Sequence, residues 1–323
     1  MNAKTVRVAA VQPICKPGPV ADNLAHMEKF IEKAAAESAE LVLLPERFTE
    51  AFRFDETAWL AASPAGGQVE QWLTDISRKY GLYLGGSYLE AKGDDFYNTF
   101  ALAGPEGKIL GRVGKDHPCS LEAYTFKPHP GPQVIDTPLG RLGVAICYDN
   151  SLRVVWDRLL NAGFDMLLMP MCAPTPQRNI IYTEKKIAAY HDSFRNGATL
   201  FAELLGVPAI MTNKAGPWDT PLPGWLPSIH SSFPGFSHIA DSDGSELARL
   251  DAKEGVITAE VRLDPERKHL QLPSDADRYR PWIVPVPADY KSFALFEFFG
   301  RRSYKKSHRR LELARRAVRE DAQ

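Results

Sequence analysis

Short apolar runs alternate with segments of helical periodicity along most of this chain. Residues 6–12 form a mostly apolar run that predicts a buried strand. Residues 20–38 carry apolar side chains at helical spacing, at Leu24, Met27 and Ile31, and predict a helix. Repetition of this strand–helix pair predicts an α/β fold built in layers. The pattern alone leaves open whether the strands form one doubly wound sheet or two sheets.

The other elements follow from the same two periodicities. Strands are predicted at residues 41–45, 82–89, 97–103, 108–114, 134–137, 141–147, 164–171 and 207–213. Helices are predicted at residues 67–80, 151–162 and 179–205, with Gly197 as a candidate break in the last. Residues 217–234 are rich in Pro, aromatic residues and turn formers, and predict a loop of the kind that shapes substrate sites.

Cys147 marks the most informative of these strand ends. The apolar run 142–146 stops at this cysteine, and polar residues and a predicted helix follow, with Asn150 or Ser151 as the expected N-cap. A helix N-terminus would stabilise a thiolate there, as a nucleophile requires. The alternative is a small core residue, because unpaired cysteine is among the most buried residue types.

Two other strand ends carry charged residues that could serve such a nucleophile. Glu46 follows a short apolar run and Pro45, and a partly desolvated carboxylate is a usable base near neutral pH. Lys115 follows another predicted strand and could stabilise a thiolate or a developing oxyanion. Taken singly, each is more typical of a solvated strand end; the three together indicate an active site.

Three segments resemble the nitrilase superfamily of carbon–nitrogen hydrolases. They are LLPERF around Glu46, GKDHP around Lys115 and GVAICYDN around Cys147, and the resemblance extends over residues 6–263. It implies a four-layer αββα sandwich of the nitrilase superfamily type. We divide the chain into a hydrolase domain, residues 1–265, and a C-terminal extension, residues 266–323.

The resemblance also implies a role for each residue and no cofactor or metal. Cys147 would attack the carbonyl or nitrile carbon, Glu46 would act as general base and then acid, and Lys115 would stabilise the tetrahedral intermediate. Glu122 fits the position of a further family glutamate. The backbone N–H of Tyr148 would complete the oxyanion hole.

Candidates for substrate contact are less specific. Trp218, Trp225 and His230 in the predicted loop could form pocket walls or merely cover the core. Cys119 could line the pocket or fill space beside it. Asn213, which ends a predicted strand, is a further candidate.

Other side chains offer weaker alternatives. Cys172 also ends a predicted strand, but Ala173 and Pro174 after it offer no helix N-terminus. His117, His129 and Cys119 fit no standard ligand spacing, so we predict no metal site. A papain-like Cys–His pair stays open, although no histidine lies in a recognisable signature and a glutamate is the better candidate base.

The residues after Cys147 indicate which branch of the nitrilase superfamily the chain resembles. True nitrilases usually have Trp-Glu after the cysteine. This chain has Tyr148-Asp149 there, and that pair resembles amidases and N-carbamoyl hydrolases. We therefore expect a thiol hydrolase of a small amide or N-carbamoyl compound. A nitrilase is the second enzyme interpretation. A catalytically silent binding module is a third, although Glu46, Lys115 and Cys147 are all present.

Charge is uneven along the chain. The 323 residues carry a net charge of −1, which gives no electrostatic case for nucleic acid or membrane as a partner. The N-terminus lacks a signal-like apolar segment, so we expect a reduced, cytoplasmic setting that suits a thiol enzyme. Residues 301–323 are strongly basic, with nine Lys or Arg against three acidic residues.

The basic C-terminal segment predicts a helix docked on an acidic partner surface; binding of nucleic acid or anionic lipid is the alternative. We expect a homodimer or higher homo-oligomer that uses the C-terminal segment. Its aromatic side chains, Phe293, Phe296, Phe298 and Phe299, would supply buried contact area.

Overall fold

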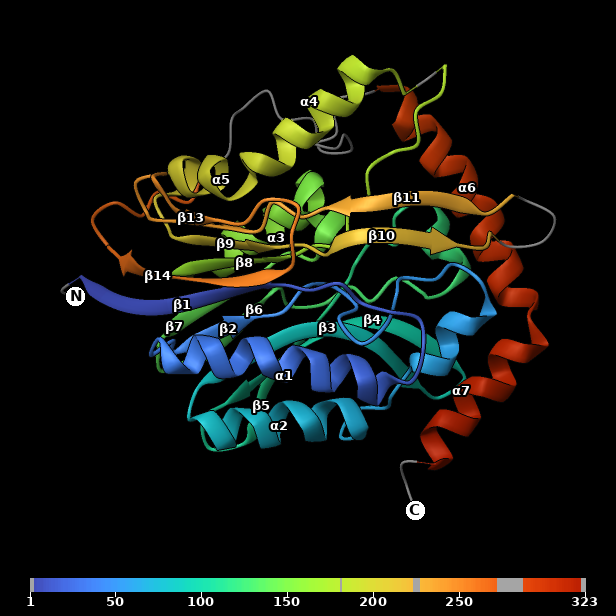
Figure 1. Cartoon of the computed structure of the whole chain (residues 1–323), viewed down its shortest axis with the longest axis horizontal. Coiled ribbons are helices and arrows are strands. Elements are labelled where there is room, and N and C mark those ends of the chain that lie inside the picture. The colour runs from blue at the N-terminus through green and yellow to red at the C-terminus, as the bar shows by residue number, and fades with distance from the viewer. Residues whose placement is uncertain (1–2, 181, 223–226, 272–286, 321–323) are drawn as a thin grey trace.

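The protein consists of two six-stranded sheets packed face to face, with helices on their outer faces (Figure 1). The computed structural model describes residues 3–180, 182–222, 227–271 and 287–320. The first sheet has the strand order β14 (Gly255–Leu263), β1 (Lys4–Gln12), β2 (Leu41–Leu43), β3 (Tyr83–Lys92), β4 (Asp95–Gly104) and β5 (Lys108–Gly114). The second has the order β13 (Glu246–Arg249), β12 (His238–Ala240), β9 (Ala209–Thr212), β8 (Met166–Pro170), β7 (Gly140–Val144) and β6 (Val134–Thr137).

Three apolar layers hold the sandwich together. Alternate residues of a strand point to opposite faces of its sheet, so Val8 of β1 joins the core between the sheets while Ala9 packs toward the helices. In β8, Leu168 faces the other sheet, whereas Leu167 packs outward. Strands buried on both faces need apolar residues at nearly every position, which explains the continuous apolar runs in the sequence.

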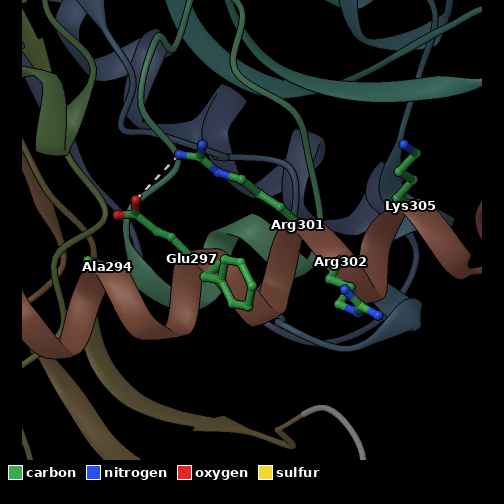
Figure 2. Close-up of a pocket in the computed structure, with 6 residues that line it drawn as sticks. Ala294, Glu297, Arg301, Arg302 and Lys305 are labelled. Atoms are coloured by element: carbon green, nitrogen blue, oxygen red, sulfur yellow. Dashed lines mark hydrogen bonds and ion pairs between the residues drawn. The ribbon is translucent and has the colours of Figure 1, made fainter.

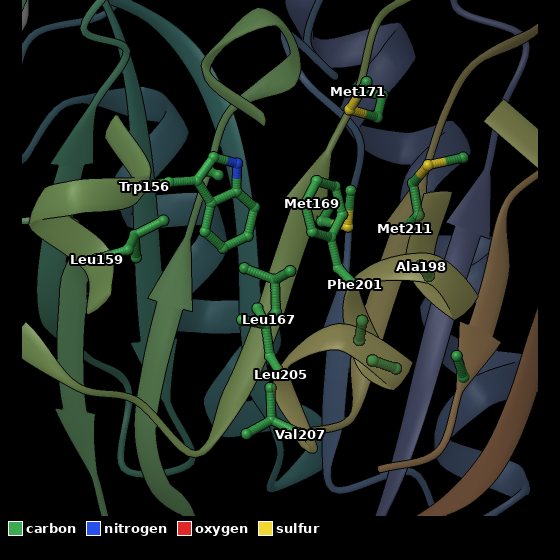
Figure 3. Close-up of a cluster of buried hydrophobic side chains, with 14 of the residues drawn as sticks. Trp156, Leu159, Leu167, Met169, Met171, Ala198, Phe201, Leu205, Val207 and Met211 are labelled. Carbon is green, nitrogen blue, oxygen red and sulfur yellow. The ribbon is translucent and has the colours of Figure 1, made fainter. Parts of the chain in front are cut away.

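The outer layers are amphipathic helices. Helices α1 (Val20–Ala36) and α2 (Gln68–Tyr80) cover the first sheet. Helices α3 (Arg153–Ala162) and α5 (Gly197–Leu205) cover the second, where the Trp156 and Phe201 rings stack with centroids 4.5 Å apart (Figure 3). The predicted αββα sandwich is thereby confirmed.

Two predicted segments differ from the structure. The long helix at 179–205 is divided into α4 (Glu184–Arg195) and α5, with the break beside Gly197 as anticipated. Residues 217–234 are not simply a loop: β10 (Ala215–Thr220) and β11 (Ile229–Pro234) form a two-stranded antiparallel ribbon. Several of the turn-forming residues lie between these strands in the sequence. Pro217 is tolerated in β10 because a strand of a two-stranded ribbon has an outer edge, where a missing N–H removes no hydrogen bond between the strands.

The N-cap prediction beside Cys147 is also wrong. A 3-10 turn, η3 (Cys147–Ser151), begins at Cys147, and α3 begins only after Leu152. The N-cap position is Leu152, and no side chain caps the helix. The Asn150 amide nitrogen instead donates to the carbonyls of Ala145 and Cys147, at 2.6 and 3.1 Å. This contact ties the turn to the end of its own strand.

The C-terminal extension packs on the chain's own first sheet (Figure 1). Helix α7 (His308–Glu320) contacts β3, β4 and the 3-10 turn η1 (Glu56–Ala61). Arg315 pairs with Asp94 at 2.7 Å, and the buried Arg310 pairs with Asp95. The acidic surface that receives the basic helix therefore belongs to the same chain; a second subunit stays a prediction.

Helix α6 (Pro287–Lys306) joins α7 to the rest of the molecule. Its Tyr304 is buried against Trp59 and Phe96, and the Tyr304 hydroxyl accepts the Phe96 N–H at 2.8 Å. Among the described helices, none has a stretch both long enough and apolar enough to cross a bilayer.

Candidate active site

Three strand ends deliver the predicted catalytic residues to one edge of the sandwich. β2 and β3 are parallel, and β5 runs in the same direction because two antiparallel pairings separate it from β3. Glu46 and Lys115 therefore follow carboxyl ends at the same edge of the first sheet. Cys147 follows the carboxyl end of β7 in the second sheet. The two sheets meet here, where the Glu46 N–H donates to the Met171 carbonyl at 3.1 Å.

A buried lysine between two carboxylates forms the centre of the site. The Lys115 ammonium lies 2.7 Å from Glu46 Oε1 and 2.6 Å from Glu122 Oε2, and all three side chains are buried. Desolvation would lower the pKa of Lys115, but the attraction of both carboxylates outweighs it and raises the pKa well above its usual value. The ammonium consequently keeps its charge at neutral pH and fixes both carboxylates in place.

Glu122 differs from a surface carboxylate in its titration. Burial raises the pKa of Glu122 to about 7, with Lys115 opposing and Glu46 adding to that rise. Its Oε2 also accepts the Cys119 N–H at 2.6 Å. The structure therefore brings Glu122, the candidate for the further family glutamate, into contact with Lys115.

One carboxylate oxygen of Glu46 remains available for proton transfer. Oε1 accepts hydrogen bonds from Lys115 and from the Asn98 amide, both at 2.7 Å. Oε2 is buried and has no hydrogen-bond partner among the described residues. A buried acceptor without a partner is costly, and at a catalytic centre it can accept a proton during turnover.

Cys147 is partly exposed, but it is not the stabilised thiolate that the sequence suggested. Burial raises the pKa of the Cys147 thiol well above its usual value, Glu46 adds to the rise, and Lys115 opposes it. No α-helix begins at Cys147, so no helix dipole offsets the desolvation. The thiol thus keeps its proton at rest and needs a base.

Strained backbone accompanies each of the three catalytic segments. Arg47, Ser120 and Cys147 have φ angles of 50°, 53° and 49°, a region that residues with a Cβ rarely adopt. Such strain persists only where surrounding contacts hold it, and it clusters at functional sites. The buried Lys214 holds the first segment by donating to the carbonyls of Arg47 and Glu50, at 2.9 and 2.6 Å.

Sequence reasoning missed two supporting residues. Asp149 is buried and accepts the backbone N–H groups of Asp116 and His117, at 2.8 and 3.0 Å, which ties the nucleophile turn to the lysine loop. A charged residue directly after an apolar strand and nucleophile was a signal for it. Asn98, which orients Glu46, lies mid-strand and gives no such signal.

The predicted substrate contacts are distributed unevenly. Tyr148 and Cys119 adjoin the catalytic groups, and the Tyr148 ring lies edge-to-face with Phe293 of α6, with centroids 5.8 Å apart. His230 is largely exposed and pairs with Asp219. Trp225 lies outside the described residues.

Two of the predicted substrate contacts have structural roles. Asn213 is fully buried and uses its amide to bind the backbone of Ala173, Lys214 and Gly235, which leaves it little capacity for substrate. Trp218 is buried in an aromatic cluster, and its indole donates to the Phe52 carbonyl at 3.0 Å.

The rival thiol of Cys172 adjoins the nucleophile without replacing it. The Cys172 side chain is buried, and its backbone N–H lowers the pKa of the Cys147 thiol, against the larger rise from burial. Such a donor favours the Cys147 thiolate once a base has taken its proton. In the part of the chain that the structure describes, no group of three His, Cys, Asp or Glu side chains has the arrangement of a metal site.

Comparison with known proteins gives the family. The family described as carbon-nitrogen hydrolase matches residues 7–268. Nitrilase 1 of Arabidopsis thaliana is 34% identical over 192 residues, covering 53% of this chain and 54% of that protein. Omega-amidase NIT2-B of Xenopus laevis is 32% identical over 177 residues, covering 51% of this chain and 62% of that protein. The chain thus spans little more than half the length of these relatives.

Solved structures agree on the fold. A carbon–nitrogen hydrolase from Helicobacter pylori G27 superposes with a TM-score of 0.71 at 20% identity, covering 82% of this chain and 91% of that one. Saccharomyces cerevisiae Nit3, described as a member of branch 10 of the nitrilase superfamily, gives a TM-score of 0.62 at 26% identity, covering 81% and 91%.

The sandwich, with its buried glutamate–lysine pair and the neighbouring cysteine, defines a protein of the nitrilase superfamily. Within it, this chain belongs to the carbon–nitrogen hydrolase family.

Proposed function

We propose that this protein is a cofactor-free thiol hydrolase that cleaves the carbon–nitrogen bond of a small amide or N-carbamoyl compound. The observation that carries the proposal is the buried Oε2 of Glu46, which lacks a partner among the described residues while Lys115 and Asn98 hold Oε1. A neutral Cys147 thiol needs such a base.

The first half-reaction forms an acyl-enzyme. Glu46 Oε2 takes the thiol proton as the Cys147 sulfur attacks the carbonyl carbon. The Lys115 ammonium and the Tyr148 N–H stabilise the resulting oxyanion. Collapse of this intermediate breaks the carbon–nitrogen bond, and Glu46 returns the proton to the departing amine or ammonia.

The second half-reaction releases the acid. Glu46 takes a proton from water, whose oxygen attacks the thioester carbon of the acyl-enzyme. Collapse of the second tetrahedral intermediate expels the Cys147 sulfur, which recovers its proton from Glu46. The enzyme thereby returns to its starting state.

Two relatives support the amide reaction. The omega-amidase of Xenopus laevis covers about half of this chain. A mutant amidase from Nesterenkonia sp. AN1 carries the acetamide moiety of fluoroacetamide on its active-site cysteine. Nitrile hydrolysis is the second candidate, because Nitrilase 1 is similar over a comparable length.

The test measures ammonia and carboxylate release from small amides, N-carbamoyl compounds and nitriles, for the wild type, Cys147→Ala and Cys172→Ala. We expect release from an amide or N-carbamoyl substrate by the wild type and Cys172→Ala, and none by Cys147→Ala. Release from nitriles alone would favour the nitrilase. Release that survives in Cys147→Ala would contradict the assigned nucleophile.

A silent binding module remains the alternative from another functional class. In that case no substrate would be hydrolysed, and Cys147 would react with fluoroacetamide no faster than Cys15. Peptide mapping after alkylation at neutral pH separates the two thiols. Selective reaction at Cys147 supports an active nucleophile.

A further inference from the structure

Helix α6 lies directly against η2 (Ser120–Tyr124), the turn that carries Glu122. The helix itself is outside residues 7–268, which the family model matches. Close approach depends on Gly300, where a Cβ would lie 2.9 Å from the carbonyl carbon of Ala123. Real Cβ atoms are not found so close to backbone, so any other residue would push α6 away from η2.

Glu297 is the polar side chain that α6 presents to this turn. Its Oε1 accepts the Ser120 N–H at 3.4 Å, and its Oε2 lies 3.4 Å from Arg301 (Figure 2). The side chain is only 19% exposed. Burial raises the pKa of Glu297, with the Ser120 N–H and Arg301 opposing that rise.

The Ser120 peptide matters because of its position in the active site. Ser120 has a φ of 53°, which is strained for a residue with a Cβ and requires external support. The adjacent Cys119 N–H donates to Glu122 Oε2 at 2.6 Å, and the same oxygen accepts from Lys115. Movement of this peptide would therefore displace Glu122, one of the two carboxylates that hold the Lys115 ammonium.

We infer that Glu297 is a positioning residue for catalysis: it holds the strained Ser120 peptide and thereby fixes Glu122 and Lys115. The chemistry that it supports rests on the proposed function. The C-terminal extension is thus part of the active site of its own chain. Phe293, one turn earlier in α6, contributes by packing its ring against Tyr148.

A surface pocket beside Glu297 makes the contact testable. Glu297 and Arg301 line a pocket along α6, together with Ala294, Phe298, Arg302 and Lys305 (Figure 2). Truncation of Glu297 would let water reach the Ser120 peptide and loosen it. A glutamine would keep an acceptor oxygen at the same place.

The experiment compares Glu297→Ala and Glu297→Gln in the full chain, with Glu312→Gln as the control. Glu312 is an acid of α7 that is 63% exposed and pairs with Arg309. For Glu297→Ala we expect kcat to fall about tenfold with KM changed less than about threefold, because geometry and not affinity is lost. Glu297→Gln should recover most of kcat, and Glu312→Gln should match the wild type.

Reaction with fluoroacetamide separates this inference from the proposed function. The Cys147 sulfur displaces fluoride, and Glu46 takes the thiol proton, so the rate at which the acetamide adduct forms on Cys147, followed by mass spectrometry, reports the same centre separately from cleavage of the amide bond. Slower alkylation in Glu297→Ala, rescued in Glu297→Gln, supports the inference even if no amide is hydrolysed. Wild-type rates of both turnover and alkylation in Glu297→Ala would overturn it while leaving the hydrolase intact.

Thermal unfolding separates positioning from general packing. Equal loss of kcat in both Glu297 variants, with an equally lowered Tm, would overturn the inference in favour of packing. If Glu297→Ala does not fold, Gly300→Ala tests the same seating of α6, because it forces the helix away from Ala123. Unchanged kcat in that variant would refute a role for the contact.

Discussion

Replacing Glu122 by glutamine should make the protein more stable at pH 8 while lowering its activity. Glutamine has nearly the shape of a protonated glutamate but cannot ionise. Burial raises the pKa of Glu122 from an ordinary 4.5 to about 7, so the folded state disfavours its charged form. The wild type must nevertheless carry that charge above neutral pH.

The pKa difference sets the size and sign of the effect. Each pKa unit corresponds to about 1.4 kcal/mol, so this shift amounts to about 3 kcal/mol. The folded-state pKa is raised, so the stabilising contribution is fully present below about pH 4.5 and is lost as the pH rises through about 7. Glu122→Gln should not lose stability in this way as the pH rises, because glutamine does not ionise.

The assay is thermal unfolding at pH 5 and pH 8 for the wild type, Glu122→Gln and the exposed control Glu312→Gln. For a chain of this length, about 3 kcal/mol corresponds to a Tm difference of about 4 °C. The Tm of Glu122→Gln minus the Tm of the wild type should therefore be about 4 °C larger at pH 8 than at pH 5.

Activity is measured in the same samples. We expect Glu122→Gln to lower kcat by about tenfold or more, because Lys115 loses a charged partner. Parallel Tm curves for the wild type and Glu122→Gln across this pH range would refute the reasoning. That result would mean that Glu122 is already ionised at little cost in the folded protein.

Three further predictions address the supports of the site. Asn98→Ala should lower kcat by about tenfold to a hundredfold with little change in KM, because Glu46 loses an orienting donor; steady-state kinetics against a Gln71→Ala control test it. Asp149→Asn leaves one of two backbone N–H groups without an acceptor and should cost about 1–3 kcal/mol, measured by urea unfolding; an unchanged midpoint would contradict this. Phe298→Ser removes an exposed aromatic from the predicted subunit contact and should shift light-scattering mass toward the monomer, whereas a wild type already monomeric would contradict that contact.

The candidate catalytic residues were accessible to sequence reasoning because their signals are local. Glu46, Lys115 and Cys147 each interrupt the end of an apolar run, and a charged or nucleophilic residue there stands out against its neighbours. Their segments also resemble a known family. Asn98 and Glu297 have no such contrast, since each acts through a contact with a segment distant in sequence.

The errors share a physical cause. The N-cap at Asn150 or Ser151 and the helix-stabilised thiolate both assumed that α3 begins at the nucleophile. Hydrogen bonds within the turn instead delay the helix. Helix boundaries depend on such local competition for backbone groups, which apolar periodicity does not encode.

The sequence by itself determined which segments become buried strands and which charged residues stand at their ends, because burial on both sheet faces demands apolar residues at successive positions. Only the tertiary structure decided that two sheets stack, that Lys115 lies between two carboxylates, and that α6 reaches the catalytic turn. Those outcomes depend on contacts between residues that are far apart in the sequence. Desolvation and charge act over a few ångströms in space, and the sequence does not specify which distant residues come that close.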